Sequence, residues 1–281
     1  MAAMTVIVVP VFNAAEETRR CLAALQNTIS DRQAVIVIDD ASTQAEIPAL
    51  METLPDHWVR VRNESNVGFV GTANLGMALA SPGNVIVLNS DTQVTSGWLE
   101  AMLECAESDP DIASITPLSN NAEIASIPEF CQANPWPADP ERWARACAES
   151  GPGEYPEVPT GVGFCMFLRR RCLDAIGSFD ESAFGRGYGE ENDWCMRAIE
   201  AGWRHVLCDK AYVAHAGNAS FGPLGLKPGG QAMDRLLQRH PRYLEQVQAF
   251  IQRDPMRSRR ERILACFQAL DPGDSPLDAS A

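Results

Sequence analysis

Short runs of apolar residues alternate along the first part of the chain with longer segments whose apolar positions recur at helical spacing. Apolar runs rich in Val and Ile predict strands that are buried on both faces of a sheet. We expect strands at residues 5–10, 34–38, 58–62, 85–88 and 112–116, and helices at 13–25, 47–54, 72–80 and 98–108. This alternation is typical of an α/β fold with a mostly parallel sheet covered by helices.

The second part of the chain is less regular. Residues 118–159 are rich in proline and predict surface loops with one helix at 140–149. Further on we expect strands at 161–169, 204–208 and 211–215, helices at 171–176 and 193–201, and a helical tail at 231–252 that is interrupted at Pro241. The glycine and proline content of residues 217–230 predicts a mobile loop that acts as a lid.

The composition excludes several classes of protein. The chain has 281 residues and a formal net charge of −14, whereas a general nucleic-acid binder needs a basic surface, so we expect no nucleic-acid partner. Its nine cysteines include no C-x-x-C pair, which argues against a zinc site and favours a reducing cytoplasm. We see no leader peptide and no apolar run of the ~18 residues that a membrane span needs, so we expect a cytoplasmic protein.

Polar side chains follow the predicted strands at the points where these strands end. The fourth strand is followed by the triplet 89–91, and the second ends at Asp39 and Asp40. In open α/β sheets, ligands bind outside the carboxyl ends of the strands. A carboxylate such as Asp91 at this edge is suited to hold Mg²⁺ or Mn²⁺ against a phosphate, although a plain Asx turn gives the same pattern.

Several polar segments occur in an order that makes the sequence similar to a known family. They read V-P-V-F-N, V-I-D-D-A-S-T, N-V-G-F-V-G-T-A-N-L-G, L-N-S-D-T and G-E-E-N-D-W-C-M-R-A, followed by a late H-A. Together they resemble the GT-A-fold glycosyltransferases of family 2 over about residues 4–222. The resemblance implies a Rossmann-like, mostly parallel sheet flanked by helices, and an inverting transfer of a sugar from a nucleotide diphosphate donor.

The resemblance also implies how the chain is divided. Residues 1–117 would form the nucleotide-sugar-binding half of one GT-A domain, and residues 118–222 its acceptor-binding and catalytic half. Residues 223–281 lie outside the resemblance, and we expect them to form a helical C-terminal extension with a disordered end.

The resemblance implies a donor site built mainly from the first half. Pro10 and Phe12 match positions where the family packs the base, and Asp40 matches the acid that accepts the imide N–H of uracil or thymine. The donor would therefore be a UDP- or dTDP-sugar. Further residues that match the donor site are Asn66, Gly68, Asn74, Asn89, Ser90, Asp91 and Gly161.

The family's metal motif D-x-D reads Asn89-Ser90-Asp91 in this chain, so an amide replaces its first acid. Asp91 matches the direct metal ligand, and His215 matches the late histidine that completes the metal shell. The resemblance thus implies Mn²⁺ or Mg²⁺, which would bridge donor phosphate oxygens and stabilise the leaving diphosphate.

An inverting transfer needs one base to deprotonate the acceptor hydroxyl. Counted back from Arg197, Glu191 falls on the family's base position, Asp193 would cap or orient, and Glu190 would contact the acceptor. Acids in the first turn of a helix are also favoured by the helix macrodipole alone, which is the structural alternative for these residues.

The acceptor side is less well defined by the sequence. Trp194 would be a sugar platform or a core residue, and Gly163 would let the acceptor sugar approach. The residues of the V-x-L-N-S-D and G-E-E-N-D-W motifs most resemble those of rhamnosyl- and hexosyltransferases, so we expect a glycan or lipid-linked acceptor. Residues 253–262 hold five Arg in an acidic chain and predict either a solvated helix face or an anchor at anionic membrane lipid on the inner face of the membrane. The helical tail could also pair with a second subunit in a homodimer.

Two other classes of function are compatible with parts of this pattern. A nucleotidyltransferase shares the architecture, but it would normally carry a glycine-rich loop with Arg and Lys near the first strand, and none follows residues 9–11. A non-catalytic nucleotide-sugar-binding protein of the same fold is the other alternative. The missing first acid of D-x-D favours it, whereas the presence of Asp91, Glu191 and His215 argues against it.

Overall fold

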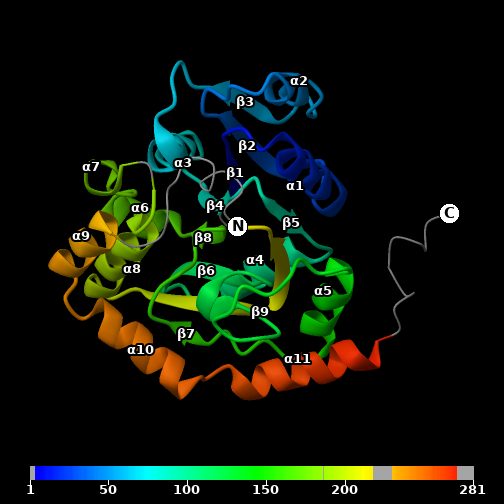
Figure 1. The fold of residues 1–281 in the computed structure, drawn as a ribbon, viewed down its shortest axis with the longest axis vertical. Coiled ribbons are helices and arrows are strands. Elements are labelled where there is room, and N and C mark those ends of the chain that lie inside the picture. The colour runs from blue at the N-terminus through cyan, green and yellow to red at the C-terminus, as the bar shows by residue number, and fades with distance from the viewer. Residues whose placement is uncertain (1–3, 186, 218–229, 271–281) are drawn as a thin grey trace.

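The computed structural model describes residues 4–185, 187–217 and 230–270, which form an α/β structure around one sheet (Figure 1). The strands are β1 (Thr5–Val11), β2 (Ala34–Asp39), β3 (Val59–Arg62), β4 (Asn84–Leu88), β5 (Thr92–Val94), β6 (Ile112–Leu118), β7 (Glu157–Val158), β8 (Cys165–Leu168) and β9 (Arg204–His215). The helices are α1 (Ala15–Thr28), α2 (Glu46–Glu52), α3 (Gly68–Leu79), α4 (Trp98–Ser108), α5 (Pro140–Glu149), α6 (Arg170–Ile176), α7 (Glu181–Phe184), α8 (Glu190–Glu200), α9 (Gln231–Arg239), α10 (Tyr243–Arg253) and α11 (Arg257–Ala269), with a 3₁₀ turn η1 (Glu123–Ala125).

The sheet has a parallel N-terminal half and a mixed second half. Its strand order is β3-β2-β1-β4-β8-β6-β9-β5, and β7 also pairs with β9. Strands β3, β2, β1 and β4 are parallel, whereas β8 is antiparallel to β4 and to β6. Strand β9 is parallel to β6 and antiparallel to β5 and β7. The α/β architecture with flanking helices that the sequence predicts is confirmed.

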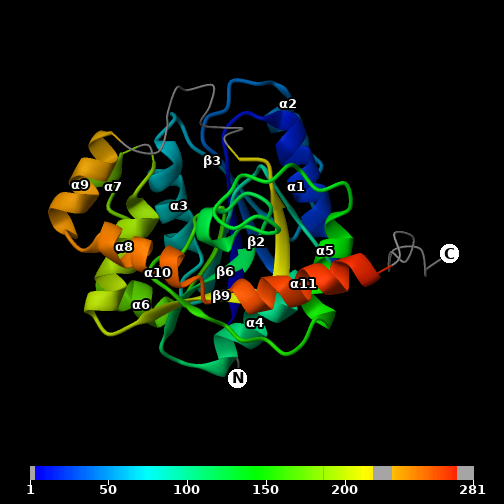
Figure 2. The same ribbon diagram turned by 60° about the horizontal axis from the view of Figure 1, so that its bottom comes forward.

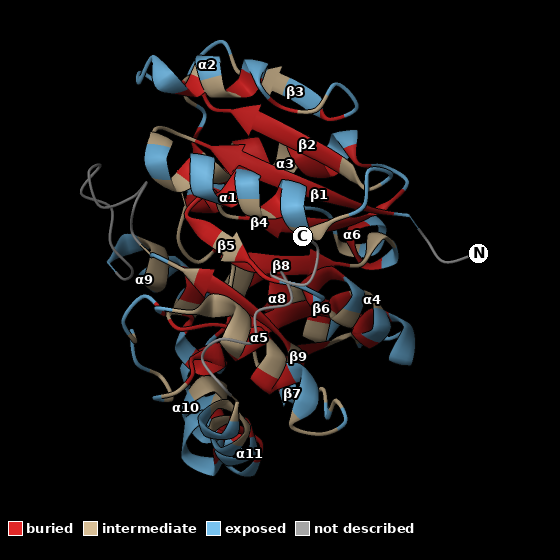
Figure 3. Cartoon of the chain, turned by 90° about the vertical axis from the view of Figure 1, so that its right-hand side faces the viewer, coloured by how far each residue is buried: buried red, intermediate tan, exposed pale blue. Residues whose placement is uncertain are grey.

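Strands β1, β2 and β4 are apolar between their first and last residues because both faces of the sheet are covered. On β1, Ile7 and Val9 pack into one hydrophobic cluster, and Val6 and Val8 pack into the other. Helices α1, α4 and α5 supply the first cluster, and α3, α6 and α8 supply the second. Figure 3 shows the buried strands between helices whose outer faces are exposed. A strand in this setting favours apolar side chains on both faces, which is why these runs were predictable.

Several boundaries differ from the prediction for physical reasons. Helix α3 begins at Gly68 instead of residue 72, because the carboxylate of Asp40 accepts hydrogen bonds from the backbone N–H groups of Val67 and Gly68. Helix α8 begins at Glu190 instead of residue 193. The two strands expected at 204–208 and 211–215 are one continuous strand, β9, which pairs with three others along its length.

The C-terminal helices α9, α10 and α11 follow one another along one edge of the molecule (Figures 1 and 2). Within them, the arginine stretch at 253–262 is only partly solvated: Arg253, Arg257 and Arg262 are exposed, whereas Arg259 and Arg260 are buried, and the lipid-anchor alternative stays a prediction. Arg259 is 0% exposed, and its Nε lies 2.6 Å from Oδ2 of Asp209 in β9. Arg260 donates to both carboxylate oxygens of Asp254 at 2.7 and 2.6 Å. These arginines hold α11 in place, and no helix in the described ranges is long and apolar enough to cross a membrane.

Three expectations concern residues outside the described ranges. They are the lid at 217–230 (except its two end residues), the boundary between 222 and 223, and the disordered end beyond residue 270.

Candidate functional site

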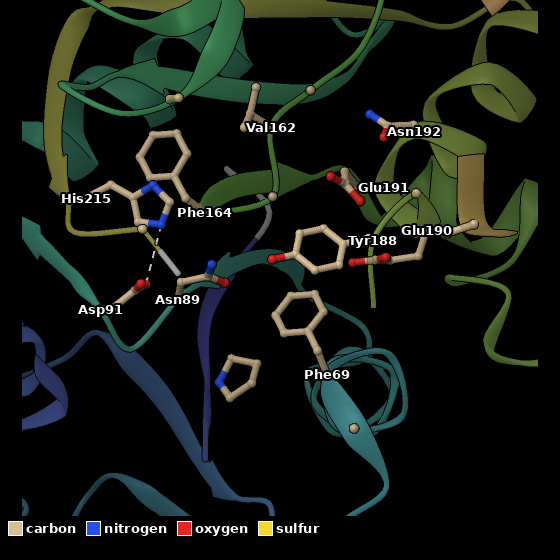
Figure 4. A pocket seen from close by; sticks show the side chains of 18 of the residues that line it. Phe69, Asn89, Asp91, Val162, Phe164, Tyr188, Glu190, Glu191, Asn192 and His215 are labelled. Carbon is tan, nitrogen blue, oxygen red and sulfur yellow. Dashed lines mark ion pairs between the residues drawn. The ribbon is translucent and has the colours of Figure 1, made fainter. Parts of the chain in front are cut away.

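A cavity of about 480 Å³ opens where β1, β2 and β4 end (Figure 4). It brings together most of the residues that the sequence nominated, although they come from seven separate segments. Those that line it are Pro10, Phe12, Asp40, Asn66, Gly68, Asn89, Ser90, Asp91, Gly161, Gly163, Glu190, Glu191 and His215. The cavity therefore lies at the sheet edge where open α/β proteins bind ligands.

One end of the cavity is organised around Asp40. Its side chain is buried, and it accepts hydrogen bonds from Asn63 Nδ2 at 2.8 Å and from the N–H groups of Val67 and Gly68 at 2.9 Å each. A carboxylate has about four acceptor positions, so these three bonds leave room for one more donor. Asp40 thus fixes the start of α3 and keeps limited capacity to accept from a ligand.

Asp91 and His215 lie together in another corner of the cavity, opposite Asp40. The pairing of Thr92 in β5 with His215 in β9 brings them together, and His215 Nε2 lies 3.5 Å from Asp91 Oδ1. His215 Nδ1 lies 2.6 Å from the carbonyl oxygen of Asn121, and its ring stacks on Phe164 with centroids 5.0 Å apart. Because a carbonyl only accepts, Nδ1 carries hydrogen, and in the neutral ring Nε2 presents its lone pair.

This corner fits a divalent cation that is held partly by its substrate. Burial lowers the pKa of His215, but the hydrogen bond and charge of Asp91 and the bond to the Asn121 carbonyl together outweigh burial, and the pKa is raised overall. No group of three His, Cys, Asp or Glu side chains that could hold a metal occurs in the described residues. Asn89 Oδ1 is buried without a partner next to Asp91, so the protein offers one carboxylate, one imidazole and one amide oxygen. Phosphate oxygens and water would complete the shell of Mn²⁺ or Mg²⁺.

Glu190 and Glu191 form an acidic wall across the cavity from this corner (Figure 4). Gly189, with φ 94°, precedes them and lets α8 start at the cavity edge. The Oε2 atoms of both glutamates are buried and have no hydrogen-bond partner. Burial raises the pKa of Glu191 to about 7, and burial followed by the charge of Glu191 raises the pKa of Glu190 well above its usual value.

The electrostatic setting of this wall explains the raised pKa values. None of the described residues that line the cavity is Lys or Arg, so no cation there stabilises the ionised carboxyls. The charge of Glu123 in η1 adds to the effect on Glu191. A carboxyl whose pKa lies near neutrality is suited to take a proton at physiological pH.

Three nominated residues do not line the cavity. Trp194 is 0% exposed and its indole N–H donates to the Gly177 carbonyl at 2.9 Å, so the expectation of a sugar platform is wrong and its core alternative is right. The side-chain amide of Asn74 donates to the Phe179 carbonyl at 2.9 Å and accepts from the Phe179 N–H at 3.1 Å, so it holds the backbone and does not face the cavity. Asp193 is buried in an ion cluster below the cavity, where it can orient but cannot touch a substrate.

Sequence reasoning missed several cavity residues. The aromatic side chains of Phe69 and Tyr188 lie between the two ends of the cavity (Figure 4). Glu123 comes from the loop-rich segment 118–159. Helices α9 and α10 contribute four mostly apolar side chains near the acidic wall, those of Ala232, Met233, Leu236 and Tyr243. Two of these residues carried a local signal: Phe69 lies inside the N-V-G-F-V-G motif, and Tyr188 directly precedes the residues G-E-E-N-D-W.

Comparison with known proteins identifies the family. The description "Glycosyl transferase family 2" applies to residues 6–177, which is more than half of the chain. Fold, cavity and this match define an enzyme that transfers glycosyl groups. The chain belongs to glycosyl transferase family 2, which leaves the nucleotidyltransferase alternative without support.

Characterised and uncharacterised relatives extend the match. An uncharacterised protein of Mycobacterium tuberculosis is 28% identical over 224 residues, which cover 77% of each chain. The N-acetylglucosaminyl-diphospho-decaprenol L-rhamnosyltransferase of the same species is 27% identical over 235 residues, covering 74% of this chain and 75% of the relative.

Solved structures show the same fold. GalNAc-T7, crystallised with UDP, GalNAc and Mn²⁺, superposes with a TM-score of 0.60 at 16% identity, covering 76% of this chain and 44% of that one. The mannosyltransferase PcManGT from Pyrobaculum calidifontis, with GDP-Man and Mn²⁺, has a TM-score of 0.56 at 14% identity, covering 86% of this chain and 70% of that one.

Proposed function

We propose that this protein is an inverting, metal-assisted glycosyltransferase that moves a hexosyl or rhamnosyl group from a UDP- or dTDP-sugar to a hydroxyl of a glycan or lipid-linked acceptor. The observation that carries the proposal is the opposition of two groups across one cavity. Asp91 and His215 lie on one side, and Glu190 and Glu191 lie on the other (Figure 4). An inverting displacement needs a base on the face of the sugar opposite the leaving group.

The donor's nucleotide would occupy the end of the cavity near Pro10, Phe12 and Asp40. The remaining acceptor position of Asp40 suits the imide N–H of uracil or thymine. Asn66 adds a buried Oδ1 without a partner at the same end. The diphosphate would then point toward Asp91 and His215.

Asp91 and His215 would hold the divalent cation, with Asn89 beside them. When bound, Mn²⁺ or Mg²⁺ neutralises charge that develops on the leaving diphosphate. The contribution of the chain itself is to keep His215 Nε2 directed at Asp91 through the bond from Nδ1 to Asn121.

Glu191 is the proposed general base, and it would take the proton of the attacking hydroxyl at its free Oε2. A Cβ atom added at Gly163 would lie 3.7 Å from the carboxyl carbon of Glu191, so glycine keeps the space beside the base open for an acceptor. Glu190 would contact the acceptor beside it. The apolar residues Ala232 and Met233 at this end suit an acceptor with an apolar portion, such as a lipid-linked glycan.

The test is release of nucleotide from UDP- and dTDP-sugars, with GDP-mannose included, in the presence of Mn²⁺ and of simple glycosides or polyprenyl-diphosphate glycans. We expect Glu191→Gln to lower turnover by at least about 100-fold, the usual scale for general-base catalysis, without changing the Kd for the free nucleotide. Glu123→Gln, which changes another cavity acid, is the matched control and should cost far less. Unchanged turnover in Glu191→Gln would contradict the base assignment.

A further inference from the structure

A buried ion cluster joins the C-terminal extension to the helix that carries the acidic wall. Its centre is Asp193, whose side chain is 1% exposed. Asp193 Oδ2 accepts from Arg197 Nε at 2.8 Å, and Oδ1 accepts from His240 Nε2 at 3.0 Å and from Arg239 at 3.2 Å. Burial would raise the pKa of Asp193, but the bonds from Arg197 and His240 outweigh burial and lower it.

The cluster bears directly on the position of the glutamates. Asp193 lies in the first turn of α8, two residues after Glu191, and the N-terminus of α8 has no side-chain cap. Nothing in the capping of this helix therefore fixes how its first turn points. The contacts of Asp193 join that turn to Arg239, the last residue of α9, and to His240, in the connection between α9 and α10.

Among the partners of Asp193, His240 has the most protected contact. The side chain of His240 is 5% exposed, whereas those of Arg239 and Arg197 are 41% and 25% exposed. Arg197 also donates to the carbonyls of Ile176 and Ser178, so it serves the end of α6 as well. His240 Nδ1 lies 3.5 Å from Oε1 of Glu200, at the far end of α8. The imidazole therefore lies near side chains from both the first turn and the last residue of α8, and its one hydrogen bond to the helix is the bond to Asp193.

We infer that His240 is a positioning residue, which holds the first turn of α8 through Asp193 and so fixes Glu191 in the orientation needed for base catalysis. This inference rests on the proposed function. It gives the C-terminal extension a role in the reaction, since the same extension also walls the acidic end of the cavity through Met233 and Tyr243. The carboxylate of Asp193 accepts, so the hydrogen of this bond sits on Nε2 of His240.

Two substitutions of His240 distinguish a role in holding the first turn of α8 through the hydrogen bond to Asp193 from a role in filling space. Gln can place a donating N–H near the position of Nε2, so His240→Gln should retain the bond, whereas His240→Met fills the space without a donor. The matched control is Arg260→Met, which removes the ion pair with Asp254 in the same C-terminal extension but touches no residue of α8.

The first measurement is hydrogen–deuterium exchange of peptides that cover residues 187–201, read by mass spectrometry on the full chain. We expect exchange in this region to rise about tenfold in His240→Met, and to stay near the wild-type rate in His240→Gln and Arg260→Met. The second measurement is nucleotide release from the donor on which the wild type is most active. Here His240→Met should lower kcat at least about tenfold at unchanged donor KM, and His240→Gln should restore most of it.

The outcomes separate this inference from the proposed function. Wild-type exchange and kcat in His240→Met would overturn the positioning role, as would an equal rise in exchange in Arg260→Met. An unchanged kcat with raised exchange would make the contact merely structural. If the wild type releases no nucleotide from any donor, the proposed function fails and with it the role in base catalysis, while the exchange data still judge the contact between His240 and α8.

Discussion

Replacement of Glu191 by Gln should stabilise the protein at alkaline pH while it abolishes turnover. Burial raises the pKa of Glu191 from 4.5 to about 7, so the folded protein holds a proton that the unfolded chain releases between these values. Stability therefore falls as pH rises through this window, because the native state binds more protons there than the unfolded state. The carboxamide of Gln cannot ionise, and it removes this loss.

The size of the effect follows from the two pKa values. Ionisation of Glu191 costs less than about 1 kcal/mol at pH 5 and about 3 kcal/mol at pH 8. For a chain of this length, these energies correspond to a Tm increase in Glu191→Gln of about 1 °C at pH 5 and about 5 °C at pH 8. Scanning calorimetry at both pH values measures the difference. Glu107→Gln, an exposed position on α4, is the control and should shift Tm equally little at both.

A Tm difference between wild type and Glu191→Gln that is the same at pH 5 and at pH 8 would refute this reasoning. It would mean that the carboxyl ionises in its ordinary range, and that the dry, cation-poor wall does not raise its pKa. A suitable base for chemistry at neutral pH would then have to be sought elsewhere in the cavity.

Three further predictions test other parts of the structure. In wild type, kcat/KM should rise about tenfold per pH unit below pH 7 and level off above it, because the base must be deprotonated; a pH–rate profile checks this for Glu191. Gly189→Ala should destabilise the protein by about 2 kcal/mol in urea unfolding, since φ is 94° and the new Cβ would lie 3.0 Å from the Phe184 ring, and it should lower turnover. Arg259→Met should cost about 3 kcal/mol by the same measurement, because it leaves Asp209 buried without its cation.

The fold and the end of the cavity that holds Asp40 and Asp91 could be predicted because they depend on local patterns. Strand β1 is apolar at each position that two helix layers cover, and Asp40 and Asp91 come directly after such strands. Chain order alone therefore placed these carboxylates at one sheet edge.

The remainder depends on contacts between residues that are far apart in sequence. Asp193 pairs with His240, and Arg259 pairs with Asp209. No local sequence pattern predicts either pair. The burial of Arg259 and Arg260 in ion pairs was not predicted, because the sequence of residues 253–262 resembles a solvated basic stretch. Trp194 is buried because α8 begins at residue 190: its first residues, Glu190 and Glu191, face the cavity, and Trp194 faces the core. The sequence placed the start of this helix at residue 193 and so could not predict which way Trp194 points.

Calorimetric titration of the protein with UDP, dTDP and GDP, each with and without Mn²⁺, tests most directly whether the cavity binds a nucleotide-sugar donor. We expect UDP or dTDP to bind in a metal-dependent way, and Asp91→Asn to abolish the effect of the metal. Absence of binding by every nucleotide under both conditions would contradict the assignment of this cavity as a donor site.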